Sequence, residues 1–60
     1  MLDIKKIQVF PTQEIFATYF DDTTKQINAE KLTQILDEKQ NHVKKWSFVA
    51  GIEIVQFYPF

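Results

Sequence analysis

Several residue types that small proteins use to stabilise a fold or to build a site are scarce in this sequence. The 60 residues include no cysteine, one histidine and one glycine. The lack of cysteine excludes disulfides and thiolate metal sites. A single histidine excludes a multi-histidine metal site, and the one glycine, Gly51, lies among apolar residues rather than in an acidic calcium-binding loop. We therefore expect neither a metal nor a cofactor.

Arginine is also absent, because all seven basic residues are lysines. This excludes bidentate recognition of phosphates or guanine edges by guanidinium groups. The formal net charge of −1 argues against a broad phosphate-binding surface, which requires clustered cations. The same small charge is also insufficient for a protein that mimics the dense negative charge of DNA.

Long apolar runs are missing as well, and the first ten residues do not have the pattern of a signal peptide. Asp3 lies in that stretch, and no run approaches the ~18 apolar residues of a membrane-spanning helix. We expect no membrane segment and a cytoplasmic location. The contents of 45% hydrophobic and 25% charged residues are typical of a globular protein, and the length predicts a single domain over 1–60.

The most apolar part of the chain is its last fifteen residues, WSFVAGIEIVQFYPF. Five of them are aromatic, and Glu53 is the only one with a charged side chain. A chain of this length buries only ~60% of the surface that its unfolded form exposes. Small domains without disulfides or metals often use a second subunit for further burial. The sequence therefore predicts self-association or docking to a partner.

The first twenty residues predict a β-hairpin. Residues 2–10 are rich in β-branched and aromatic residues that alternate with polar ones, and Pro11 ends this strand because it has no N–H to donate. Residues 15–20 fit a strand by composition, but they also fit a short helix with aromatic i, i+4 pairs. We favour the strand, which makes 2–20 a hairpin, and a polar turn follows at 21–24.

A single amphipathic helix is predicted after this hairpin. Asn28 is a favourable N-cap residue. One face of the helix carries apolar residues spaced i, i+3 and i+4, namely Leu32, Ile35 and Leu36. We expect the helix to end between Gln40 and Lys44.

Two alternating segments follow the helix, residues 45–50 and 52–57. Gly51 between them fits either a type II hairpin turn or a bulge in one long strand. Trp46 and Phe48 are expected to lie in the core, beside the helix. The predicted fold is α+β, a small antiparallel sheet of three to four strands with one helix on one face, in the order β-β-α-β-β or β-β-α-β.

One helix leaves the other face of such a sheet uncovered, and an apolar patch there indicates a protein interface. We expect this partner or dimer interface to comprise Val49, Val55, Phe57, Tyr58 and Phe60, with the first three facing away from the helix. The predicted function is a non-enzymatic protein-binding module, a homodimer that modulates or inhibits a larger partner. Its composition, low in glycine and rich in Asn, Gln, Lys and Ile, is similar to that of phage and mobile-element accessory proteins.

The alternative prediction is a dimeric β-sheet regulator that binds nucleic acid. Two lysine pairs, Lys5 with Lys6 and Lys44 with Lys45, would form a basic stripe if they align on neighbouring strands. Aromatic residues on a sheet can stack on bases while lysines follow the phosphates. The negative net charge makes this the second choice.

No arrangement of residues predicts catalysis. His42 has Ser47 nearby in sequence, but no glycine turn that would form an oxyanion hole accompanies them, so a solvated histidine at a helix end is the simpler interpretation. The paired carboxylates at 21–22 and 37–38 lie in a polar turn and on a polar helix side, which does not hold two carboxyl groups across a cleft. We expect no enzymatic activity and no catalytic residues.

Overall fold

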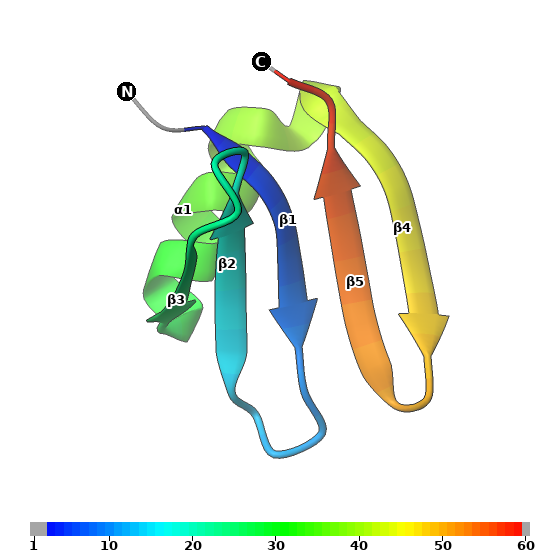
Figure 1. Cartoon of the computed structure of the whole chain (residues 1–60). Coiled ribbons are helices and arrows are strands. Elements are labelled where there is room, and N and C mark those ends of the chain that lie inside the picture. Colours follow the sequence, from blue (N-terminus) through cyan, green and yellow to red (C-terminus); the bar gives the residue numbers. More distant parts are fainter. Residues whose placement is uncertain (1–2, 60) are drawn as a thin grey trace.

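The computed structural model describes residues 3–59. It contains one antiparallel β-sheet, whose central strand is β1 (Ile4–Val9). The five strands have the order β3-β2-β1-β5-β4, and all neighbours are antiparallel (Figure 1). The other elements are β2 (Ile15–Tyr19), β3 (Thr24–Ile27), α1 (Ala29–Lys39), the 3-10 helix η1 (Gln40–His42), β4 (Val43–Val49) and β5 (Ile52–Phe57). In Figure 1, α1 lies behind the sheet, and we call the opposite side, toward the viewer, the open face.

The predicted α+β class is confirmed, but the predicted number of strands is wrong. Three or four strands were expected, and the described residues form five. The missed strand is β3, in which three exposed residues precede the half-buried Ile27. A polar edge strand lacks the alternation of apolar and polar residues on which strand prediction depends. The preference for a strand over a helix at residues 15–20 is confirmed, because β2 occupies this segment.

A bulge near the start of β1 explains how Ile4 and Ile7 both face the helix. Residues three apart in a regular strand face opposite sides of the sheet. The register of β1 against β2 shifts between Ile4 and Lys6, which inserts one extra residue and restores the same facing. A second shift, between Val43 and Lys45, occurs where β4 pairs with β5.

The helix begins where the sequence predicts. The side-chain oxygen of Asn28 accepts a hydrogen bond of 2.7 Å from the backbone N–H of Lys31, which satisfies one of the free donors of the first turn. The α-helix ends at Lys39, one residue before the predicted window, and η1 continues the helical path to His42.

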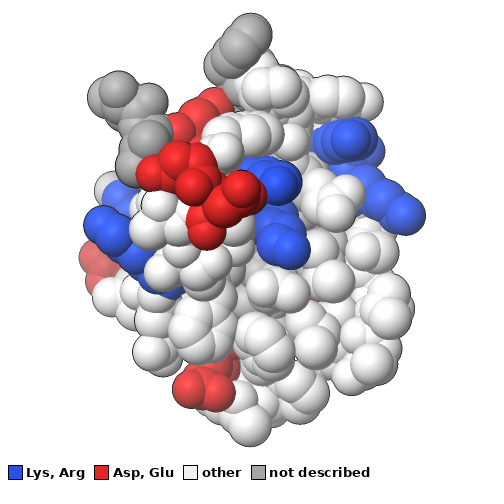
Figure 2. All heavy atoms as spheres, viewed as in Figure 1, with Lys and Arg blue, Asp and Glu red and all other residues white. Residues whose placement is uncertain are grey.

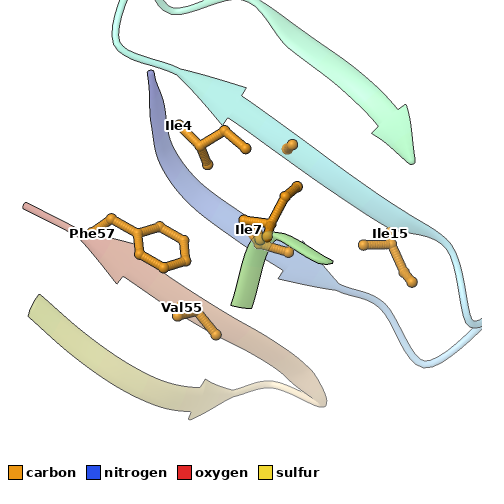
Figure 3. Packing of buried hydrophobic residues seen from close by; sticks show 7 residues of the cluster. Ile4, Ile7, Ile15, Val55 and Phe57 are labelled. Atoms are coloured by element: carbon orange, nitrogen blue, oxygen red, sulfur yellow. The ribbon is translucent and has the colours of Figure 1, made fainter. Parts of the chain in front are cut away.

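The core lies between α1 and the three central strands. Its buried members are Ile4, Ile7, Ile15, Ala17, Ile35, Val55 and Phe57 (Figure 3). Ile7 has no exposed surface, and the register places it directly opposite both Ala17 on β2 and Val55 on β5. The expectation that Val55 and Phe57 face away from the helix is therefore wrong. Alternation along β5 is real, but it places these two residues, rather than Ile52 and Ile54, on the covered side.

A tight hairpin joins β4 to β5, which resolves the two alternatives for Gly51. Val49 pairs with Ile52, so the loop consists of Ala50 and Gly51. Their φ angles are +54° and +80°, and positive φ at both central residues is characteristic of a type I′ turn rather than the type II turn considered above. A bulge in one long strand is thereby excluded.

The helix is too small to cover the whole sheet. Its eleven residues make a rod about 16 Å long and about 10 Å wide. Five strands spaced about 4.8 Å apart span about 19 Å between the outermost two. Figure 1 shows α1 behind the β2 and β3 side, and the lower parts of β4 and β5 have no helix behind them. The described chain thus leaves two surfaces without a covering layer, the helix side of β4 and the open face.

Candidate functional site

The outer strand β4 carries three exposed apolar side chains, Trp46 and Phe48 on one face and Val49 on the other, which we call the β4 strip. Their exposed fractions are 55%, 72% and 59%. Trp46 lies opposite the core residue Val55, so it and Phe48 point to the helix side, where α1 does not cover them. The expectation that Trp46 and Phe48 belong to the core is wrong, because the helix is too short and lies over the other half of the sheet.

The indole of Trp46 is held in a defined position. Its Nε1–H donates a hydrogen bond of 2.7 Å to Oε2 of Glu53 on the neighbouring strand. Between this ring and the helix lies a shallow pocket of about 420 Å³, lined by Leu36, Asp37, Gln40, Val43 and Trp46. The β4 strip therefore continues into a groove with an apolar floor and a polar rim.

The residues expected to form an interface fall into three groups. Val49 and Tyr58 are exposed, with 59% and 52% of their surface accessible, and their role in an interface stays a prediction. Val55 and Phe57 are 2% and 3% exposed and contribute to the core. Phe60 lies outside the described residues. Sequence reasoning missed Trp46 and Phe48 as surface residues, and no feature of the sequence alone indicates which strand the helix leaves uncovered.

The lysines considered for nucleic-acid binding gather at one end of the open face. Lys5, Lys6 and Lys44 line a pocket of about 350 Å³ together with Phe20, Gln56, Phe57 and Pro59. Lys45 lies in the same row, because Gln56 pairs with Lys6 on one side and with Lys45 on the other. The two lysine pairs are on β1 and β4, which are separated by β5, so they are not on neighbouring strands as expected.

An acidic turn borders this basic end. Nζ of Lys5 lies 3.3 Å from Oδ1 of Asp22, in an exposed ion pair. Asp21 in the same turn accepts hydrogen bonds from the hydroxyl and the backbone N–H of Thr23, and these bonds lower the pKa of its carboxyl group. No ion pair within residues 3–59 involves Lys6, Lys44 or Lys45.

The residues considered for catalysis occupy solvated positions. His42 is exposed at the end of η1, and Ser47 is half-buried on β4 opposite Ile54. The carboxylates of residues 37–38 are exposed on α1. The expectation that the chain is not an enzyme stays a prediction.

Comparisons with known proteins give no family for this chain. No protein-family model, no curated protein and no solved structure matches it. A search of the described residues for a helix with the length and apolar character needed to cross a membrane found none. The two surfaces described above are therefore the basis for a functional proposal.

Proposed function

We propose that this chain functions through protein–protein association, as a homodimer that forms along β4. The observation that carries the proposal is the β4 strip, in which three residues within four positions expose more than half of their surface. Trp46 and Phe48 lie on the same face of the strand, and monomeric proteins seldom leave large apolar side chains exposed next to each other. A small domain also gains stability from the apolar area that a second subunit covers.

Pairing with a second copy fits the position of the strip. β4 is an edge strand, and the outward N–H and C=O groups of an edge strand can pair with another strand. A two-fold axis lets the same edge serve both copies. With that axis at Ser47, antiparallel pairing places Trp46 of each copy opposite Phe48 of the other, on the helix side of a continuous ten-stranded sheet.

The charges on β4 are consistent with this register. Lys44 and Lys45 occupy one end of the strand, and the half from Trp46 to Val49 has no charged side chain. Antiparallel pairing about Ser47 places Lys45 opposite Val49 of the second copy, so like charges do not face each other.

Sedimentation equilibrium at about 5 to 100 µM tests the proposal. We expect a dimer for the unmodified chain and a monomer for Phe48→Asp, because a carboxylate at the centre of the interface would be buried without a partner. Tyr58→Asp is the matched control, since Tyr58 is similarly exposed but lies beyond β5 rather than on β4. Circular dichroism of each variant verifies that the fold is kept.

Two outcomes would contradict the proposal. If the unmodified chain is a monomer at all concentrations, the proposed homodimer is contradicted. A dimer that Tyr58→Asp disrupts and Phe48→Asp leaves intact moves the interface away from β4, to the C-terminal surface that the sequence first indicated.

A further inference from the structure

The small net charge of the chain conceals an uneven distribution of charge among its elements, because the five strands contain five lysines and a single carboxylate. Among the residues of the five strands, the one acidic side chain is Glu53, which faces the helix side and binds Trp46. The helix α1 carries three further carboxylates, at residues 30, 37 and 38, together with two lysines, Lys31 and Lys39. Figure 2 shows the open face, with basic side chains at the centre and upper right, an acidic group directly beside the central ones, and a broad uncharged surface at the lower right. A net charge of −1 is therefore compatible with a locally basic surface.

Two β-bulges bring the basic side chains together. Each register shift falls at a lysine pair, Lys5 with Lys6 in β1 and Lys44 with Lys45 in β4. A bulge sets two residues of one strand against a single residue of its partner, and so redirects a side chain that regular alternation would send to the other face. This accounts for the presence of Lys5, Lys6 and Lys44 around one pocket.

The pocket forms where the sheet splits. β1 pairs with β5 from Lys6, opposite Gln56, to Val9, and the residues of β1 before Lys6 have no partner on β5. Beyond Gln56, β5 pairs only with β4, through Phe57 and Val43. The lysines thus surround a recess between two diverging strands, rather than lying on a flat surface.

An aromatic side chain lines the same recess. Phe20 is 39% exposed and is part of the pocket wall. On β2, alternation places Phe16 and Thr18 on the open face, with Phe16 opposite Gln8 of β1 and Gln26 of β3. The surface next to the lysines therefore offers aromatic rings and amide groups and has no acidic residue in its strands.

We propose that this end of the open face binds single-stranded nucleic acid. Lys6, Lys44 and Lys45 contact the phosphates, and Lys5 joins them when its ion pair with Asp22 opens. Phe20 stacks on a base next to these phosphates. A strand with splayed bases fits this arrangement better than a duplex, since stacking on a side chain requires an unpaired and accessible base.

Fluorescence anisotropy with a labelled 20-nucleotide single strand of mixed sequence, as DNA and as RNA, at about 20 mM salt tests this proposal. Each phosphate contact to a single strand contributes about −0.7 to the slope of log affinity against log salt, so four lysines predict about −2.8. The double variant Lys6→Gln/Lys45→Gln should bind more weakly and reduce the steepness of that slope by about 1.4. Phe20→Ala should weaken binding at least about fivefold.

Charge-matched and ring-matched controls accompany these variants. Lys25→Gln/Lys31→Gln removes the same two charges from β3 and α1, and Tyr58→Ala removes an exposed ring that lies outside both β4 and the pocket lining. Both controls should leave binding within about twofold of the unmodified chain. An equal loss of affinity in the two lysine double variants would show unspecific attraction and would contradict a site at the bulges.

Other outcomes also count against the proposal. The absence of any binding at 100 µM protein overturns it, and so does equal affinity for a duplex of the same sequence. Binding to vesicles that contain anionic lipid, without binding to the oligonucleotide, assigns the lysines to a membrane surface instead. The Phe48→Asp variant should bind the oligonucleotide as a monomer, so failure of the homodimer and failure of this site are distinguishable.

Discussion

The hairpin of β1 and β2 and the outer strand β4 are both rich in apolar residues but differ greatly in burial. β1 and β2 contribute Ile4, Ile7, Ile15 and Ala17 to the core. β4 has a tryptophan, a phenylalanine and two valines, yet it contains no buried residue. The difference follows from the position of α1, which lies over the β2 and β3 side and leaves the lower part of β4 uncovered. Burial in this fold is therefore set by which strand the single helix reaches, more than by how apolar a strand is.

The largest expected effect of a substitution comes from the covered side. Ile7→Ala should lower the free energy of unfolding by about 2–5 kcal/mol, because it removes a fully buried side chain and leaves a cavity. Phe48→Ala on the uncovered side should change it by less than about 0.5 kcal/mol in the monomer. Urea unfolding at submicromolar concentration measures both values.

A domain of this size has a total stability of only about 3–9 kcal/mol, so Ile7→Ala can prevent folding altogether. Ile7→Val is the milder variant, with an expected loss of about 0.5–1.5 kcal/mol. Equal losses of unfolding free energy for Ile7→Val and Phe48→Ala would contradict the contrast between the buried β1–β2 hairpin and the exposed strand β4.

A smaller loss of stability is expected in the turn between β4 and β5, which contacts the loop between β1 and β2. Gly51 has φ +80°, and a Cβ atom there would lie 3.2 Å from Cγ of Pro11 in the loop between β1 and β2. Gly51→Ala should destabilise the chain by about 1–2 kcal/mol, through backbone strain and this close contact. Thermal unfolding of Gly51→Ala, alone and together with Pro11→Ala, separates the two causes. If adding Pro11→Ala to Gly51→Ala does not restore any stability, backbone strain accounts for the whole loss.

Much of the fold can be predicted from local patterns. Asn28 and the i, i+3, i+4 spacing of apolar residues locate the start and the inner face of the helix, because capping and amphipathicity are local properties. β3 could not be predicted in the same way. It is held by backbone pairing with β2, and three of its four residues are exposed.

The candidate surfaces were less predictable than the fold. The facing of β5 depends on a two-residue turn, and an error of one residue exchanges the two sides of a strand. This is why Val55 was expected at an interface. Trp46 does face the helix side, as expected, and its exposure follows instead from the position of α1 over the other half of the sheet. The lysine pairs are visible in the sequence, but their convergence depends on two bulges and on the strand order, which are non-local features.

The smallest predicted effect concerns the turn residue next to Gly51. Ala50 has φ +54°, a conformation that costs an alanine about 1–2 kcal/mol and that asparagine adopts more readily. Asn followed by Gly is the preferred sequence for a type I′ turn. Ala50→Asn should therefore stabilise the chain by about 0.5 kcal/mol, which calorimetry can resolve as a rise in melting temperature. Ala50→Val is the opposing variant and should destabilise it, since a β-branched residue tolerates positive φ poorly.

A higher melting temperature for Ala50→Asn would also show that the β4–β5 hairpin unfolds together with the rest of the sheet. If Ala50→Asn protects the amides of β4 from hydrogen exchange without changing the melting temperature, the hairpin opens independently, and the two sides are separate folding units.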